Sequence, residues 1–417
     1  MQVSLIKGKE TLTVELDDAR VMGVLLPVES MTAPDPAKEL ARALRHPVAS
    51  PPLRERVKKG MRIAIVTSDI TRPCPSYLLL PPVLAELEAA GIRRQDIVIV
   101  FALGSHRKHT QEEITALVGE DIAREYRCLD ADAADMTLVG ETSRGTPLDI
   151  FRPVAEADFR ICLGNIEYHY FAGFSGGAKA IFPGASTSRS IQANHRMMVE
   201  KGAATGQNDG NPVRKDIEEL NAFLSVDFIL NVVLGPKKEI LHAVAGHYIE
   251  AHRQGCAFLD SLYKFPLDEA ADIVLVSAGG FPKDIDMYQA QKALDNARFA
   301  VRKGGVIILV ASCPELYGST TFERWMKQAD SPAWLLQEIV RNFELGGHKA
   351  AAIALALEQA TVLCVSDMPD EETRNMFFTP MPSVEAALAE ATDVCGKNSR
   401  ILVMPMGGST LPVIQSR

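Results

Sequence analysis

Residues 159–170 read FRICLGNIEYHY, an apolar run that ends at a glycine and continues into polar and aromatic side chains. Comparable short apolar runs recur at 62–66, 97–101, 273–276, 306–310, 362–365 and 401–404. Runs of this length, bounded by glycine or polar residues, are typical of strands that a parallel sheet buries on both faces. Helical periodicity marks stretches between them, such as 77–90, which ends before Gly91, a residue suited to a helix C-cap. This alternation predicts an α/β fold whose largely parallel sheets are flanked by helices.

Length and composition indicate two globular domains. A chain of 417 residues exceeds what one ordinary core supports, and its 47% hydrophobic and 23% charged residues are average for a folded protein. We place the seam near residues 263–268, just before a new strand begins. This gives an N-terminal domain of residues 1–265 and a C-terminal domain of residues 266–417. Residues 33–52, rich in proline and alanine, are expected to form a surface connection with a short helix.

Charge, apolar runs and cysteine usage exclude several classes of partner. A net charge of −9 argues against a nucleic-acid backbone as the main partner, although a local basic pocket for a small anion remains open. The longest apolar runs, such as 306–311, fall far short of the roughly 20 residues that cross a bilayer. Residues 1–16 lack the apolar core and cleavage site of a signal peptide. Seven scattered cysteines without a CxxC pair suit reduced thiols in the cytoplasm and offer no ready zinc site.

Titratable side chains follow the predicted strands. Ligands of open parallel sheets bind beyond the carboxyl ends of the strands. The segments that follow the runs are SDITRP at 68–73, LGSHRKH at 103–109, GNIEYHY at 164–170 and SAGGFP at 277–282. Three of the nine histidines thus come just after strands of the N-terminal half, beside an aspartate and an arginine, as a catalytic cleft requires. Without further context, such histidines are more often solvated loop residues, and Asp69 is more often a turn residue.

A glycine-rich loop, FAGFSGGAKA at 171–180, continues the third of these segments. Its glycines, serine and lysine suit backbone N–H groups wrapped around a phosphate. The spacing is not that of a Walker loop, because no GK[ST] triplet follows. Taken alone, the pattern fits tight turns and a surface lysine better than a phosphate site.

Segments along the chain together resemble those of the lactate racemase family. They are HYFAGFSGGAK at 169–179 with FPG at 182–184 and NH at 194–195, DITRP at 69–73, GSHR at 104–107, YQAQK at 288–292 and GGHKA at 346–350. They occur in the expected order and cover nearly the whole chain. The resemblance to the family therefore extends over the chain and does not depend on a single loop.

The resemblance implies a cofactor and a set of site residues. The cofactor of the family is a nickel pincer nucleotide, a pyridinium-3-thioamide-5-thiocarboxylate mononucleotide that is attached to a lysine and holds nickel between two sulfur arms and a ring carbon. The residues that match the family's site are Lys179 for attachment, His195 for the fourth nickel ligand, His106 and His169 for acid and base, Asp69 and Thr71 for cofactor contact, and Arg72, Tyr288, Gln289 and Lys292 for substrate contact. The loop Ser175, Gly176 and Gly177 is a hypothetical cradle for the cofactor phosphate.

The implied reaction inverts C2 of a small 2-hydroxy carboxylic acid. The hydroxyl loses a proton while the hydrogen on C2 leaves reversibly as hydride to the cofactor, so bases are needed on both sides of a planar 2-keto acid. One imidazole donor suffices for Ni(II), because the cofactor supplies the other ligands. A site between the two domains would close over the substrate and exclude water. The implied partners are the substrate and the enzymes that make the cofactor, with no nucleic acid and no membrane.

Several alternatives stay open at this stage. Lactate, malate, longer hydroxy acids and sugar acids are all credible substrates, and Arg107, Lys108 or Lys283 could hold a second carboxylate. Structural roles for His348 and Lys349 are as credible as substrate contact, and His109 is expected to be a bystander. Lys292 could be a solvated helix residue, and the oligomeric state is open. The competing functions are a non-catalytic protein that binds a nucleotide or hydroxy acid and a metal-dependent hydrolase or lyase, which the lack of an HExxH pattern disfavours.

Overall fold

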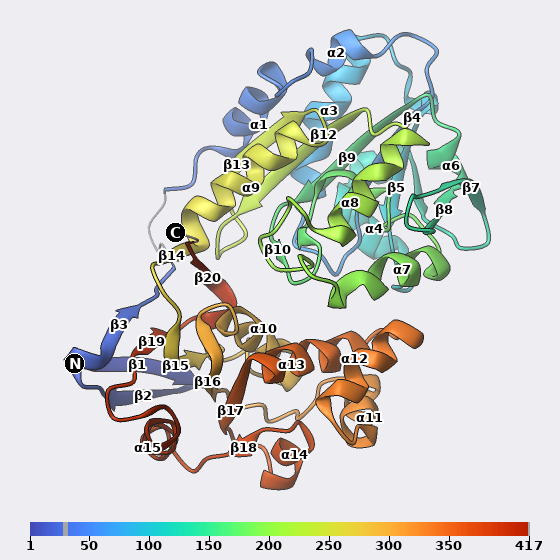
Figure 1. Ribbon diagram of the computed structural model, residues 1–417. Coiled ribbons are helices and arrows are strands. Elements are labelled where there is room, and N and C mark those ends of the chain that lie inside the picture. The colour runs from blue at the N-terminus through green and yellow to red at the C-terminus, as the bar shows by residue number, and fades with distance from the viewer. Residues whose placement is uncertain (28–31, 416–417) are drawn as a thin grey trace. The chain divides into compact units, whose positions relative to one another are not determined.

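The computed structural model describes residues 1–27 and 32–415 and divides them into two compact units (Figure 1). The central unit consists of residues 32–261, and the terminal unit combines residues 1–27 with residues 262–415. The sequence-based division into 1–265 and 266–417 therefore differs at the N-terminus. The physical reason is that β3 (Val21–Val24) pairs in parallel with β19 (Ile401–Met404), which places the first residues in the sheet of the terminal unit.

The central unit is built on a six-stranded sheet with the order β13-β12-β9-β4-β5-β6. Five of these strands run parallel, and β13 lies antiparallel to β12 at one edge. The strands are β4 (Ile63–Ser68), β5 (Ile97–Ala102), β6 (Arg127–Asp130), β9 (Phe159–Asn165), β12 (Phe228–Leu234) and β13 (Ile240–Gly246). Two small antiparallel pairs accompany the sheet, β7 (Met136–Glu141) with β8 (Pro147–Phe151) and β10 (Tyr168–His169) with β11 (Gly173–Phe174).

Helices connect the strands of this sheet. They are α1 (Pro36–Arg45), α2 (Leu53–Arg56), α3 (Ser76–Ala89), α4 (Gln111–Val118), α5 (Glu120–Glu125), α6 (Arg152–Ala155), α7 (Ser188–His195), α8 (Pro212–Glu219) and α9 (Glu250–Tyr263). One face of the sheet packs against α1 to α4, and residues such as Leu230 and Val232 belong to that core. Because side chains alternate along a strand, Asn231 between them points to the opposite face.

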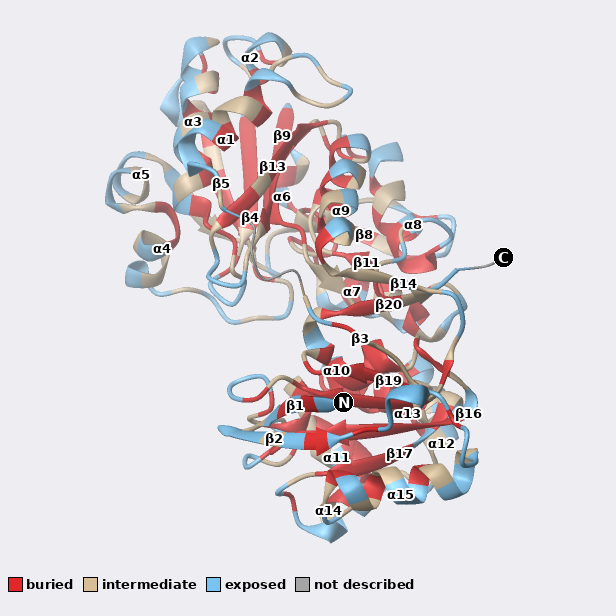
Figure 2. Ribbon diagram, turned by 90° about the vertical axis from the view of Figure 1, so that its left-hand side faces the viewer, coloured by how far each residue is buried: buried red, intermediate tan, exposed pale blue. Residues whose placement is uncertain are grey.

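The terminal unit contains a second six-stranded sheet with the order β18-β17-β16-β15-β19-β3, and all its strands run parallel. Its strands not yet given are β15 (Ala271–Ser277), β16 (Val301–Val310), β17 (Ala360–Val365) and β18 (Thr379–Pro380). The helices are α10 (Met287–Ala297), α11 (Thr320–Gln328), α12 (Pro332–Arg341), α13 (Gly347–Gln359), α14 (Asp370–Asn375) and α15 (Val384–Cys395). The remaining strands form two pairs, β1 (Gln2–Lys7) with β2 (Glu10–Glu15) and β14 (Lys264–Leu267) with β20 (Leu411–Ile414). Figure 2 shows the central strands of both sheets buried, whereas the outer helices expose one side.

The predicted α/β fold with largely parallel sheets is confirmed. Every apolar run named from the sequence coincides, to within one residue, with part of a strand in one of the two sheets, and the helix predicted for 77–90 is α3. The segment 33–52 is less superficial than expected, because Leu40 and Leu44 of α1 are buried in the core of the central unit. Across the described residues, no helix has the length and apolarity that a membrane span requires.

Candidate active site

Parallel pairing brings together the segments that follow β4, β5 and β9. β4 lies between the other two strands, and its last residue, Ser68, is in register with Ala102 at the end of β5. The loops that begin at Asp69 and Leu103 therefore leave the sheet side by side at its carboxyl edge. This arrangement joins residues that are far apart in the sequence.

Asp69 and His106 form a hydrogen-bonded pair at this edge. The distance between Asp69 Oδ2 and His106 Nδ1 is 2.8 Å, and the side chain of Asp69 is 3% exposed. Thr71 donates to Asp69 Oδ1 through its backbone N–H at 2.7 Å and its hydroxyl at 2.5 Å. Burial acts to raise the pKa of Asp69, but the bonds from His106 and Thr71 outweigh it and the pKa is lowered. An ionised Asp69 holds the His106 proton on Nδ1, which leaves Nε2 free to accept a proton.

His109, in contrast, ties two loops together. Its Nδ1 donates to Asp130 Oδ1 at 2.6 Å, and its Nε2 accepts the backbone N–H of Ile70 at 3.0 Å. The ring also packs edge-on against Phe101. Both ring nitrogens are therefore engaged in holding the loop that carries Asp69.

His169 and His195 both pack against one buried aromatic ring. Phe171 is 3% exposed, and its ring packs edge-on against His169 at 4.5 Å and against His195 at 4.7 Å between centroids. His169 ends β10, and the chain returns through β11 to a short 3-10 turn, η3 (Gly177–Ala180), that carries Lys179. The return needs Gly173, whose φ is +78° and whose added Cβ would lie 2.1 Å from the carbonyl oxygen of Gln207.

Lys179 is a partly buried amine in a cationic environment. Burial, together with the charges of Arg72 and Arg214, lowers its pKa to about 7, while Glu167 and Asp69 oppose the shift. Within the described part of the chain, Lys179 Nζ forms no hydrogen bond or ion pair. An amine with this pKa is partly neutral at pH 7 and can act as a nucleophile.

The same charges act on His169. Burial and the neighbouring charge of Lys179, followed by those of His195, Arg72 and Arg214, keep its pKa well below the usual range. The backbone N–H of Ala172 approaches His169 Nδ1 at 3.3 Å, which favours a neutral ring with its proton on Nε2. The structure thus brings His169, Lys179, His195 and Arg72 into one electrostatic cluster of the central unit.

Buried polar side chains from three other elements fix the backbone between His169 and Lys179. The bonds run from Asn211 Nδ2 to Phe171 O (2.9 Å), from Arg214 Nε to Ala172 O (3.2 Å), from Arg214 Nη2 to Phe174 O, from His252 Nε2 to Ser175 O (2.7 Å) and from Gly177 N to Asn231 Oδ1 (2.8 Å). We call Asn211, Arg214, Asn231 and His252 the clamp. All four clamp residues are 0% exposed.

Sequence reasoning missed the clamp. The one visible signal is Asn231, a polar residue inside the apolar run FILNVVL at 228–234. The other three side chains follow no strand end and no glycine pattern. Their relation to Lys179 depends on how α8 and α9 pack against the loop.

The loop predicted to hold a phosphate uses much of its hydrogen-bonding capacity internally. Ser175 Oγ donates to Asn165 O at 2.7 Å and accepts from the backbone N–H of Glu167, while Ser175 N bonds to Glu167 O. The N–H of Gly177 is held by Asn231. These contacts give no support to the phosphate role of Ser175, Gly176 and Gly177, which stays a prediction.

The predicted substrate residues of the terminal unit lie on α10. Lys292 Nζ donates to Gln289 Oε1 at 2.8 Å, and the ring of Tyr288 lies 4.9 Å from Lys349 Nζ. Lys349 is 4% exposed and donates to Gln291 Oε1 at 3.0 Å. Burial, then the charge of Lys292, lowers the pKa of Lys349 to about 7. We therefore add Lys349 to the candidate site residues of the terminal unit.

His348, next to Lys349, has a fixed position in the first turn of α13. It is 7% exposed, and its Nδ1 accepts the backbone N–H of Gly346 at 2.9 Å. Burial, with a smaller effect of Lys349, lowers the pKa of His348 to about 3. The ring is therefore neutral at physiological pH.

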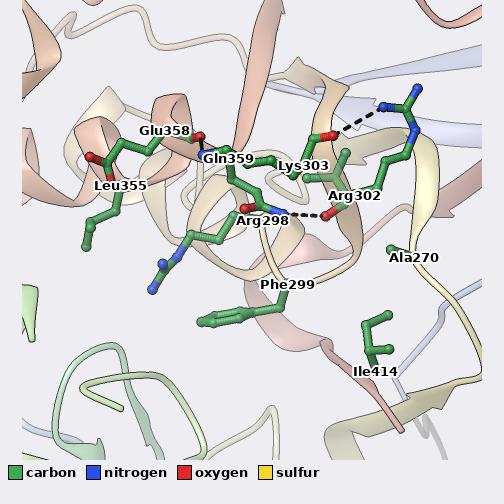
Figure 3. Close-up of a pocket in the computed structure, with 10 residues that line it drawn as sticks. Ala270, Arg298, Phe299, Arg302, Lys303, Leu355, Glu358, Gln359 and Ile414 are labelled. Carbon is green, nitrogen blue, oxygen red and sulfur yellow. Dashed lines mark hydrogen bonds between the residues drawn. The ribbon is translucent and has the colours of Figure 1, made fainter. Parts of the chain in front are cut away.

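A cavity of about 530 Å³ elsewhere in the terminal unit is lined by none of the predicted site residues (Figure 3). Three cations line it, and their side chains bond to neighbouring groups, Arg298 to Asp295, Arg302 to Asp272 and Lys303 to the carbonyl oxygen of Glu358. Among the described residues, no three His, Cys, Asp or Glu side chains are grouped as a metal ion would require.

Comparisons with known proteins give consistent matches. The family model of the lactate racemase N-terminal domain matches residues 7–206, and that of the lactate racemase C-terminal domain matches residues 267–412. The chain is 34% identical to lactate racemase of Thermoanaerobacterium thermosaccharolyticum over 97% of each chain. It is 31% identical to lactate racemase of Lactiplantibacillus plantarum over 97% of this chain and 98% of the relative.

Solved structures extend the comparison to the fold. The structure of the lactate racemase apoprotein from T. thermosaccharolyticum superposes with a TM-score of 0.87 at 32% identity and full coverage of both chains. A crystal structure of a protein from Thermotoga maritima superposes with a TM-score of 0.60 at 17% identity, covering 94% of this chain and 100% of that one. The second match concerns the fold alone.

Proposed function

The chain belongs to the lactate racemase family, and we propose that it is a racemase or epimerase that inverts C2 of a small 2-hydroxy carboxylic acid. The observation that carries the proposal is the cluster of His106, His169, Lys179 and His195 in the central unit, together with the ionised partner Asp69 of His106. The four side chains come from three separate segments of the sequence. A protein that only bound a hydroxy acid would need neither two imidazoles nor a nucleophilic amine.

The residues around Lys179 fit the nickel pincer nucleotide that the family resemblance implies. An amine with a pKa of about 7 and no hydrogen-bond partner among the described residues is suited to form an amide, and the exposed cation Arg72 suits an anionic nucleotide. In this proposal Lys179 carries the cofactor and His195 supplies an imidazole ligand to nickel. When bound, the cofactor supplies a reversible acceptor for the hydrogen on C2. The enzymes that make the cofactor are the implied partners.

The two catalytic histidines offer opposite proton functions in the described state. His106 presents a bare Nε2, and the imidazolium that forms after it takes a proton is stabilised by Asp69. His169 is neutral and presents Nε2–H, because Nδ1 accepts the N–H of Ala172. One ring is thus set to accept the hydroxyl proton, and the other is set to donate a hydrogen bond to the oxygen.

Cations hold the substrate carboxylate in this proposal. Arg72 has an exposed guanidinium, whose planar fork matches a carboxylate. Tyr288, Gln289 and Lys292 remain proposed substrate contacts of the terminal unit. Because all seven cysteines are free thiols, we also keep the cytoplasm as the proposed location.

Chiral chromatography tests the proposal directly. The protein is produced together with cofactor-making enzymes and incubated with single enantiomers of lactate, malate and longer 2-hydroxy acids. We expect inversion of at least one of them, with loss of nearly all activity in His106→Ala and in His169→Ala. His46→Ala, an exposed histidine at the end of α1, is the matched control and keeps activity.

Mass spectrometry of the same preparations tests attachment. An adduct on the peptide that contains Lys179 is expected, and Lys179→Arg removes it. Near-normal turnover in both histidine variants would refute the assignment of the bases. No adduct after production with the cofactor-making enzymes would refute the assignment of Lys179.

A further inference from the structure

Arg214 is a fully buried arginine that reaches two backbone carbonyls between His169 and Lys179. It is 0% exposed and lies in the first turns of α8. Its Nε donates to Ala172 O at 3.2 Å, and its Nη2 donates to Phe174 O. Arginine is almost never buried to this extent unless its donors are paired. Here two of the donors are used to hold one loop.

The charge of Arg214 is only partly neutralised. Its Nη1 is buried and has no hydrogen-bond partner among the described residues. Glu218 Oε1 lies 4.0 Å from Arg214 Nε, but this carboxylate also pairs with Arg253 at 2.8 Å. A buried cation without a dedicated counter-ion exerts a strong field on its neighbours, because water does not screen it.

Lys179 and His169 are the neighbours that feel this charge. Arg214 contributes to the lowered pKa of both groups. The charged and titratable groups that act on Lys179 are Arg72 from the loop after β4, Arg214 from α8, His169 from β10, and Glu167 and Asp69 with the opposite sign. Arg72 is exposed, so water screens its charge, whereas Arg214 is fully buried.

We propose that Arg214 is a positioning residue for cofactor attachment, which fixes the loop of Lys179 by its two carbonyl bonds and presents the amine in its reactive form through its buried charge. The inference rests on the proposed role of Lys179 as the attachment residue. It assigns a function to a buried side chain that touches neither substrate nor cofactor. A purely structural arginine would hold the loop but would not set the reactivity of the amine.

Trace acetylation of the full-length protein without cofactor measures this reactivity. With acetic anhydride, the Lys179 nitrogen bonds to an acetyl carbon, acetate leaves, and the amine proton passes to the buffer. Mass spectrometry gives the labelling rate of the peptide that contains Lys179 as a function of pH. The midpoint of this curve is the pKa of the Lys179 amine. We expect a midpoint near pH 7 in the natural protein.

Arg214→Met is the decisive variant. If loss of the charge raises the midpoint by one pH unit, the neutral fraction of the amine at pH 7 falls about fivefold, and labelling falls with it. Arg214→Lys keeps the charge, so its labelling midpoint should stay close to that of the natural protein. Arg160→Met is the matched control, because Arg160 is also buried and bonds three backbone carbonyls of the central unit, those of Val154, Ala155 and Ala157.

An unchanged Lys179 midpoint in folded Arg214→Met overturns the proposal, as does an equal shift in Arg160→Met. If Arg214→Met does not fold, hydrogen exchange of residues 170–178 is compared between Arg214→Lys and Arg160→Lys. Exchange that rises several-fold only in Arg214→Lys supports the clamp role, and equal exchange overturns it. These measurements need no cofactor, so they stand apart from a failure to racemise any substrate, which would count against the proposed function itself.

Discussion

The lowered pKa of Lys179 predicts that this side chain reduces the stability of the cofactor-free protein. In the unfolded chain the amine keeps its ordinary pKa of 10.5, whereas in the folded protein the pKa is about 7. Between pH 7 and 10.5 the unfolded state therefore holds a proton that the folded state lacks. Stability consequently rises with pH across this window and is lowest at and below pH 7. The difference corresponds to at most about 5 kcal/mol, at roughly 1.4 kcal/mol per pH unit.

Lys179→Met should therefore stabilise the central unit. The substitution keeps an unbranched apolar side chain and breaks no hydrogen bond of Nζ within the described part of the chain. Because the side chain is partly exposed, we expect a gain of about 2–4 kcal/mol at pH 7.5, less than the upper limit. With a folded pKa of about 7, the rise in stability from pH 7.5 to 8.5 should be smaller than in the natural protein by up to about 1.2 kcal/mol. Titrating groups that do not interact with Lys179 are common to both proteins and cancel in this difference.

Urea unfolding at pH 7.5 and 8.5, followed by far-ultraviolet circular dichroism, measures both quantities. The two tryptophans, Trp325 and Trp334, lie in α11 and α12 of the terminal unit, so their fluorescence provides an internal control that Lys179→Met should not change. If the two proteins show the same pH dependence, or if the variant is the less stable one at both pH values, the amine is not held in the partly neutral state that we infer.

Three further predictions follow from single contacts. Asp69→Asn cannot stabilise an imidazolium at His106, so kcat should fall roughly 100-fold or more while the thermal unfolding temperature changes little; this is read by chiral chromatography and calorimetry. Gly173→Ala forces a Cβ to within 2.1 Å of Gln207 O at a φ of +78° and should destabilise the central unit by about 2 kcal/mol or more, measured by urea unfolding. Lys349→Met should reduce the rise in stability of the tryptophan-detected transition between pH 7.5 and 8.5 by up to about 1.2 kcal/mol, and an unchanged rise would argue against a partly neutral Lys349.

Sequence reasoning recovers elements whose signal is local. The apolar runs become strands because a parallel sheet buries both faces, so each strand is marked by its own composition. β3 is not marked by its own composition, since its place depends on pairing with β19 near the other end of the chain. The run of β12 is interrupted by Asn231, and the interruption has a cause, because its Oδ1 holds the N–H of Gly177. A polar residue in a buried strand thus marks the loop that the strand supports.

The candidate site also contains residues that the sequence indicates and residues that only the tertiary structure reveals. The sequence places His106 and Asp69 after apolar runs, and the family resemblance implies their roles in the site. The structure adds that the two strands are neighbours in the sheet, so that their ends meet at one edge. The pair is then completed by a hydrogen bond that the sequence does not specify. Arg214 lies in PVRKDIEE at 212–219, a sequence with four charged neighbours that suggests a solvated helix. Its burial results from the packing of α8 against the loop before Lys179, which only the tertiary structure reveals.

The arrangement around Lys179 has a physical logic that links stability to function. Arg72, Lys179 and Arg214 gather positive charge near two histidines, and the carboxylates of Glu167 and Asp69 only partly oppose it. Such a cluster destabilises the cofactor-free fold, as functional sites commonly do. Conversion of the amine to an amide would remove one of these titratable groups, and an anionic nucleotide would neutralise part of the rest. The clamp is what keeps the loop in place until then, because its hydrogen bonds are directed to backbone atoms and do not change when Lys179 changes its charge.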